Sequence, residues 1–274
     1  MQINTYSQHY DLCRQEYKKD DYIGSHTYNN VHDLRMDQTF LDGIIDDKKY
    51  ASLVKNIAEK TSYKFDNNIG VFQSNLYDLI KDTNDIAEIQ ELADYIMPLI
   101  EQEIFHSYLK VEFVQVYRNR HDSEELTSFL WHYDDSPAEF LKFAIYLNDV
   151  NENSGCLQYL TSKTNEIYKY PSSRGGPYMR SQGKVYPSSR IPPDVVENTI
   201  KEGGKINNLV GSIGTYAIFT PNISHRGTKP HKNAVPRDCI MFLIRPSLKK
   251  QKTYINKRTP SIVGAKNTKI YFLD

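Results

Sequence analysis

Five short segments rich in β-branched and aromatic residues follow one another in the second half of the chain. Runs of this length and composition are typical of strands in a sheet. Turn-forming residues bound several of them, and VNENSG is predicted to join two of them as a tight hairpin. The pattern predicts a sandwich or barrel, with strands at residues 111–118, 140–150, 155–160, 215–220 and 237–246.

The residues before this β-rich part carry a helical pattern instead. Residues 46–62 and 83–109 repeat apolar residues at helical spacing, and we expect the second segment to cover a sheet. The predicted fold class is therefore mainly β with helices (α+β). We expect a single domain over residues 1–274, with a helical N-terminal part (1–110), a β core (111–247) and a C-terminal extension (248–274).

Charge and cysteine content argue against several classes of protein. The 34 Lys and Arg balance the 34 Asp and Glu, so no overall positive field would attract nucleic acid or a membrane surface. No apolar run approaches the roughly 20 residues that cross a bilayer, and the N-terminal residues lack an apolar export signal. Three widely spaced cysteines form neither a disulfide framework nor a Cys-x-x-Cys metal motif. We expect a cytoplasmic protein with no membrane or nucleic-acid partner.

The motif WHYD, residues 131–134, places an imidazole and a carboxylate two residues apart. In a strand, residues i and i+2 point to the same face, so His132 and Asp134 can approach one point while Tyr133 points away. One imidazole and one carboxylate fit adjacent positions on an iron or zinc ion. A simpler interpretation is also open, because His and Asp often cap or pair near strand ends.

A metal centre needs a further ligand from another part of the chain. Four of the eight histidines lie in the helical N-terminal part, and His121 and His231 lie in charged, turn-like stretches. His225 differs, because it follows the predicted strand at 215–220 and precedes the one at 237–246. We expect His225, at a strand end beside the returning strand, to be the third ligand.

Arg237, at the start of that returning strand, is a candidate for binding a carboxylate. A guanidinium forms paired hydrogen bonds with a carboxylate and remains charged when buried. Arg237 shares a strand face with Cys239 and Met241, so it is predicted to point into a cavity shared with the metal. The alternative is an arginine at a strand end in solvent.

The order of His132, Asp134, His225 and Arg237 along the chain resembles that of the phytanoyl-CoA dioxygenase-like (PhyH-like) Fe(II)/2-oxoglutarate-dependent dioxygenases. The resemblance spans residues 110–247 and rests on WHYD, FAIYLNDVNENSGCLQYL and GSIGTYAIFTPNISHRGTKPHKNAVPRDCIMFLIRPS, in that order. It implies a double-stranded β-helix, a cupin-like jelly-roll barrel backed by the N-terminal helices. It also implies Fe(II) as cofactor, with 2-oxoglutarate and O2 as cosubstrates.

The resemblance further implies roles for individual residues. His132, Asp134 and His225 would ligate Fe(II). Arg237 would hold the distal carboxylate of 2-oxoglutarate, and Tyr117 would make an additional cosubstrate contact. The implied reaction is hydroxylation of a small molecule at a C–H bond, with release of succinate and CO2. Halogenating enzymes of the superfamily lack the carboxylate ligand, so Asp134 favours hydroxylation. Many relatives read PGSH where this chain reads LTSKTN, and we infer no acyl-CoA substrate from the resemblance.

Residues 161–211 form a long insertion between predicted strands, rich in Gly, Pro and Ser. It carries eight basic and four acidic residues, and YPSSR occurs in it twice. Long insertions in compact domains are often functional loops, and this one is predicted to close as a lid over a small anionic substrate. Arg174 and Arg190 are the candidate substrate contacts, and a solvated loop with scattered charges is the alternative.

The sequence is also compatible with two other functions. A cupin-like protein could bind a metal without catalysis, although such a site has no need of a carboxylate-binding arginine. A nucleic-acid dealkylase could use the same iron chemistry, with the basic residues of 161–211 and 248–258 on the nucleic acid. The balanced net charge argues against this second alternative.

Overall fold

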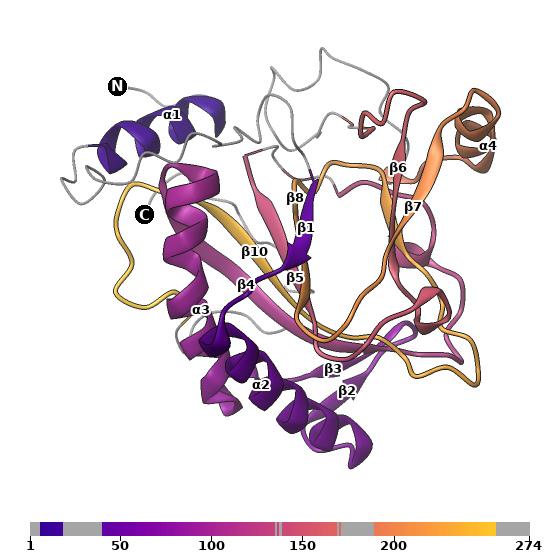
Figure 1. Ribbon diagram of the computed structural model, residues 1–274, viewed down its shortest axis with the longest axis horizontal. Helices are drawn as coiled ribbons and strands as arrows, with labels where there is room; N and C mark the ends of the chain where they lie inside the picture. Colours follow the sequence, from indigo (N-terminus) through magenta and orange to yellow (C-terminus); the bar gives the residue numbers. More distant parts are fainter. Residues whose placement is uncertain are drawn as a thin grey trace.

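The computed structural model describes residues 6–18, 40–134, 136, 139–168, 170 and 189–255. In these residues two antiparallel sheets face each other (Figure 1). The larger sheet has seven strands in the order β1-β8-β5-β10-β4-β3-β2, and the smaller has three in the order β7-β6-β9. The strands are β1 (Phe40–Ile44), β2 (Val71–Gln73), β3 (Tyr77–Ile80), β4 (Tyr108–Asn119), β5 (Leu141–Tyr146), β6 (Leu157–Thr161), β7 (Lys205–Leu209), β8 (Thr215–Phe219), β9 (His225–Gly227) and β10 (Asp238–Ser247).

The space between the sheets is filled by side chains that alternate along the strands. On β5, Ala144 and Tyr146 belong to the interior cluster, whereas Phe143 and Ile145 belong to the core on the other side of the larger sheet. The smaller sheet contributes Leu157 and Leu209 to the interior cluster. Two facing antiparallel sheets with a shared interior form a jelly-roll barrel, which is the predicted fold.

The predicted hairpin between the second and third strands is wrong. β5 lies in the larger sheet and β6 in the smaller one, so residues 147–156 carry the chain from one sheet to the other. This connection contains a 3-10 turn, η5 (Glu152–Ser154), and ends at Gly155 with φ of 85°. A Cβ at Gly155 would lie 2.6 Å from Asn119 Nδ2, so both the backbone angle and the space require glycine.

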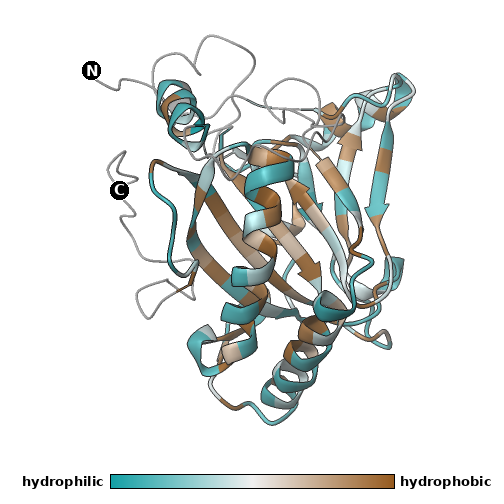
Figure 2. Cartoon of the chain, turned by 60° about the vertical axis from the view of Figure 1, so that its left-hand side comes forward, coloured by the Kyte–Doolittle hydropathy of each residue, from teal (hydrophilic) through white to brown (hydrophobic). Residues whose placement is uncertain are grey.

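Two helices cover the outer face of the larger sheet (Figure 1), and Figure 2 shows the apolar strands beneath them. α2 (Lys48–Asp66) begins at Asp47, whose Oδ1 accepts a hydrogen bond from Tyr50 N over 2.8 Å. The predicted apolar stripe on α3 (Ala87–Ile100) is buried, with Ile89, Leu92, Ile96 and Ile100 each at most 2 % exposed. These helices shield one side of the sheet, so its other side is left for the barrel interior.

The second predicted helix is shorter than residues 83–109. A 3-10 turn, η2 (Thr83–Asp85), precedes α3, and a π-helical turn, η3 (Glu101–Phe105), follows it. His106 has a left-handed backbone with φ of 47°, which ends the helical segment before β4 begins. The helices α1 (Tyr6–Tyr17) and α4 (Pro193–Lys201) and the 3-10 turn η4 (Thr127–Phe129) complete the described elements.

The first 110 residues are not only helical. β1, β2 and β3 lie in this part and extend the larger sheet at both of its edges. β1 pairs with β8, and β3 pairs with β4. Within the described residues, no helix is long and apolar enough to cross a membrane.

We expect Leu92→Ala on α3 to destabilise the protein, because Leu92 is fully buried between the helices and the larger sheet. The lost packing should lower the free energy of unfolding by about 2–5 kcal/mol. Leu99→Ala is the matched control on the same helix, because Leu99 is 44 % exposed, and it should change the free energy by less than about 0.5 kcal/mol. Urea unfolding of both variants measures the difference, and equal effects would contradict the packing of α3.

Candidate metal centre

The backbones of His132 and His225 pair directly, although the two residues lie far apart in the sequence. His132 N donates to His225 O over 3.0 Å, and His225 N donates to His132 O over 2.9 Å. The segment around His132 is therefore an extended neighbour of β9 at the edge of the smaller sheet. The returning strand β10 lies in the larger sheet, so His225 is not beside it.

Both imidazoles are held in one orientation by backbone carbonyls. His132 Nδ1 lies 2.8 Å from Leu130 O, and His225 Nδ1 lies 2.9 Å from Ile223 O. Because a carbonyl oxygen can only accept, each Nδ1 carries the proton and each Nε2 keeps its lone pair. This is the arrangement in which a histidine ligates a metal through Nε2.

Asp134 completes a group of three possible ligands. Its backbone N donates to Pro221 O over 2.9 Å. Its Oδ1 lies 3.9 Å from His132 Nε2, and its Oδ2 lies 3.5 Å from His225 Nε2. One ligand atom from each of the three residues lies within 4.8 Å of the others. Two neutral imidazole nitrogens and one carboxylate oxygen are a donor set that fits a divalent transition metal.

Burial dominates the electrostatics of this centre. It lowers the pKa of His132 from the usual 6.5 to about 4, although the charge of Asp134 opposes the shift. Burial, together with the neighbouring His132, lowers the pKa of His225 to about 3. Burial acts to raise the pKa of Asp134, but the charge of Lys142 and the two histidines outweigh it, and the pKa is lowered. At neutral pH the centre therefore presents two neutral rings and one carboxylate.

Lys142 is a polar member of the centre that the sequence analysis missed. It lies on β5, and its ammonium pairs with Asp134 Oδ2. Its position has the same parity as the inward residues Ala144 and Tyr146. A lysine at an inward position of an otherwise apolar strand was the signal that could have found it.

Arg237 lies inside the barrel, just before β10, and is 3 % exposed. Its guanidinium lies 5.5 Å from the ring centre of Tyr117 and 5.8 Å from that of Tyr146. Its Nη2 donates to Asn119 Oδ1 over 3.3 Å, whereas its Nε is buried and has no hydrogen-bond partner within the described residues. Among the described residues no acid forms an ion pair with it, and a buried charge without a counterion is costly. The surroundings of Arg237 therefore suit an anionic ligand.

Arg237 and the three possible ligands are linked through β9. The strand begins with His225 and ends with Gly227, where a Cβ would lie 3.3 Å from Arg237 Nη2. The predicted cosubstrate contact Tyr117 is 9 % exposed and lies beside the guanidinium. The structure thus brings the possible metal ligands, Arg237 and Tyr117 into one barrel.

Arg190, one of the two arginines predicted to bind substrate, lies within the described residues. It forms a backbone bridge with His132, on the other side of that residue from β9, and it is half-buried. Burial lowers the pKa of Arg190, and the charge of Asp134 opposes this shift. Arg190 therefore lies beside the metal centre. Arg174 lies outside the described residues, together with residues 169 and 171–188 of the predicted lid. The described remainder of 161–211 is not one long loop, because it contains α4 and the strand β7, which pairs with β6.

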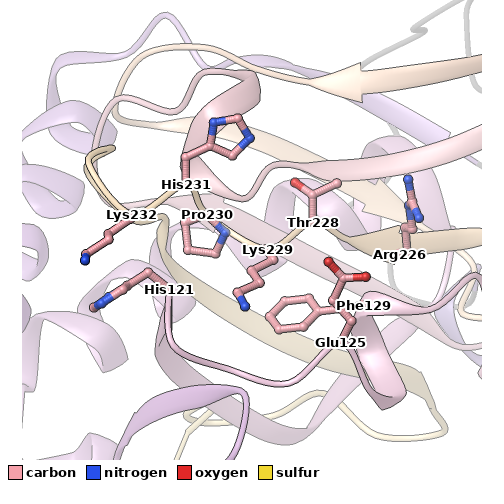
Figure 3. Close-up of a pocket in the computed structure, with 9 residues that line it drawn as sticks. All are labelled: His121, Glu125, Phe129, Arg226, Thr228, Lys229, Pro230, His231 and Lys232. Atoms are coloured by element: carbon pink, nitrogen blue, oxygen red, sulfur yellow. The ribbon is translucent and has the colours of Figure 1, made fainter.

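A separate open pocket of about 530 Å³ is lined by residues from η4, β9 and the loop after β9, and by none of the three possible ligands (Figure 3). His121 and His231, the two alternatives to His225, line this pocket and do not join the metal centre. Arg226 also lines it, packed 4.8 Å from the ring centre of Trp131, and so points away from its neighbour His225.

Solved structures share the fold of this chain, although no family model matches the chain and neither does any curated protein. EctD from S. alaskensis with bound Fe has a TM-score of 0.52 at 12% identity, covering 84% of each chain. EctD with 2-oxoglutarate and 5-hydroxyectoine has a TM-score of 0.51 at 13% identity, covering 88% of this chain and 86% of that one. The epimerase SnoN in complex with Fe3+, alpha ketoglutarate and nogalamycin RO has a TM-score of 0.51 at 14% identity, covering 86% of this chain and 83% of that one. At these identities the likeness establishes the fold, and the predicted jelly-roll barrel is confirmed.

The lowered pKa values of the two histidines predict how the metal-free protein responds to acid. Between pH 6.5 and about 4, the unfolded chain takes up protons on both rings while the folded protein does not. The free energy of unfolding should therefore fall as the pH is lowered through this window. The lowered pKa of Asp134 affects stability only at lower pH, because its usual value is 3.8.

Urea unfolding at a series of pH values, in the presence of a chelator, measures this dependence. The variant His225→Asn has no titrating ring at that position and should show a shallower fall over the same window. Equal slopes in the two proteins would contradict the burial of a neutral His225.

Proposed function

We propose that the protein is a non-haem Fe(II)/2-oxoglutarate-dependent oxygenase that hydroxylates a C–H bond of a small molecule and releases succinate and CO2. The observation that carries the proposal is the convergence of His132, Asp134 and His225, with both Nε2 atoms free to ligate. Two histidines and one carboxylate on one face of an iron ion leave positions open for a cosubstrate and dioxygen. With these bound, iron supplies the oxidising power that the protein side chains lack.

Each residue of the chain then has a task that follows from its surroundings. Leu130 and Ile223 fix the two rings through their carbonyl groups, so the Nε2 atoms need no reorientation when a metal binds. The guanidinium of Arg237 receives the distal carboxylate of 2-oxoglutarate, and the ring of Tyr117 packs against that site. The apolar barrel interior excludes water from the reacting groups.

Two features of the site narrow the function further. Asp134 supplies a carboxylate at the position where a halogenating enzyme would need space for a halide, so we propose hydroxylation. Arg237 is buried and has no acid partner in the described part of the chain, which argues for a carboxylate cosubstrate that a non-catalytic metal-binding protein does not need. The named neighbours bind different small molecules, nogalamycin RO and 5-hydroxyectoine, and a small-molecule substrate is proposed here on the same fold.

The first test of the proposal is metal binding. We expect His132→Ala, Asp134→Ala and His225→Ala each to abolish Fe(II) binding and Fe(II)-dependent conversion of 2-oxoglutarate to succinate, because each removes one of three ligands. Anaerobic calorimetry measures binding, and circular dichroism should show an unchanged fold.

His121→Ala and His231→Ala are the matched controls, because both histidines line the separate pocket. They should bind Fe(II) as the wild-type protein does. Loss of Fe(II) in either control, with binding retained in His225→Ala, would contradict the ligand assignment. A wild-type protein that binds Fe(II) but never consumes 2-oxoglutarate would instead support the non-catalytic alternative.

The second test concerns Arg237. Arg237→Lys keeps the charge but loses the paired donors, so the apparent KM for 2-oxoglutarate should rise by about tenfold or more while the fold is unchanged. Arg226→Lys is the control, because Arg226 donates to Gln158 outside the barrel interior. Initial rates of succinate formation at varied 2-oxoglutarate give the comparison. An unchanged KM in Arg237→Lys would assign the distal carboxylate to another residue.

A further inference from the structure

Lys142 is an inward-facing cation at the metal centre. Its side chain is 14 % exposed, and its ammonium lies 6.0 Å from the ring centre of Phe219. Asp134 is the acid with which it pairs in the described part of the chain, and that carboxylate is also the proposed metal ligand. The same negative charge therefore serves two positive partners once a metal is bound.

The net charge around Lys142 and Asp134 would change when a metal binds. One carboxylate neutralises Lys142 in the metal-free protein, but a divalent ion and an ammonium together exceed it. The distal carboxylate of 2-oxoglutarate is taken by Arg237, which leaves only one carboxylate of this cosubstrate for the centre. An excess positive charge remains at a site that is largely closed to water, where such an excess attracts an anion.

We propose that Lys142 is an anion-binding residue of the active site, which receives a carboxylate or phosphate group beside the bound metal. The inference rests on the proposed function and names the chemistry that the site recognises next to the metal. The anion belongs either to 2-oxoglutarate or to a second, anionic molecule, which is then the substrate. Lys142 acts by charge-assisted hydrogen bonding to that anion while the metal holds Asp134.

The position of Lys142 suits this task. β5 is a central strand of the larger sheet, paired with β8 on one side and β10 on the other, so its inward residues are fixed in direction. Arg190 is a second cation near Asp134, on the opposite side of His132 from β9. An anion between Lys142 and the metal would thus also lie within the field of Arg190.

The experiment compares wild-type protein with Lys142→Met, Lys142→Arg and the control Lys205→Met, which changes an exposed strand lysine on β7. Mn(II) replaces Fe(II) so that no turnover occurs. In the first arm, 2-oxoglutarate is titrated into Mn(II)-loaded protein by calorimetry. In the second arm, inorganic phosphate is added at saturating 2-oxoglutarate, and the broadening of its phosphorus NMR signal by Mn(II) reports binding beside the metal.

Lys142→Met should weaken binding in one of the two arms by about tenfold, because it removes a charge-assisted hydrogen bond. Loss in the first arm assigns the anion to 2-oxoglutarate, and loss in the second assigns it to an additional anionic molecule. Mn(II) should bind Lys142→Met at least as tightly as wild type, because a like charge has been removed. Lys142→Arg should retain anion binding, and Lys205→Met should match wild type.

Unchanged affinity of Lys142→Met in both arms would overturn the proposal. So would a parallel loss of Mn(II) and anion affinity, because a merely structural role produces that result. Failure of the wild-type protein to bind Mn(II) or 2-oxoglutarate would instead contradict the proposed function itself, so the two failures are distinguishable.

Discussion

The pair of backbone hydrogen bonds between His132 and His225 is the interaction on which the metal centre depends. It joins the segment after η4 to β9 and so brings two histidines from distant parts of the chain into one place. Because the bonds are between backbones, the side chains remain free for a ligand. The carbonyls of Leu130 and Ile223, each two residues before its histidine, then fix the rings. The geometry of the centre is therefore set by main-chain pairing, which few side-chain substitutions would disturb.

The helices on the outer face stabilise the fold and so offset the burial of polar groups in the barrel interior. α2 and α3 bury one side of the larger sheet in a continuous apolar core. The barrel interior can then hold polar groups, among them Asp134, Lys142 and Arg237, whose burial opposes folding. The outer face of the larger sheet therefore contributes mainly to stability, and its inner face carries the polar groups of the candidate site.

Local patterns in the sequence predicted much of the site, and long-range pairing explains what they missed. The spacing of His132 and Asp134 and the exclusion of other histidines were enough to identify the three residues that converge. The strand β1 was missed because Asp42 and Gly43 interrupt a short segment whose partner, β8, comes late in the chain. The hairpin was predicted wrongly because the sheet to which a strand belongs depends on distant partners. Lys142 was missed although its inward parity could be read from the strand.

The buried polar groups of the barrel interior indicate how bound ligands would change the stability of the folded protein. The Nε of Arg237 has no hydrogen-bond partner among the residues that the structure describes, and the carboxylate of Asp134 pairs with Lys142. A metal ion and a carboxylate would satisfy these groups only in the folded state, because unfolding separates residues that come from different segments of the chain. Ligands that bind only the folded state stabilise it in proportion to their affinity and concentration. The residues whose burial opposes folding therefore also link the folding of the protein to the binding of metal and anion.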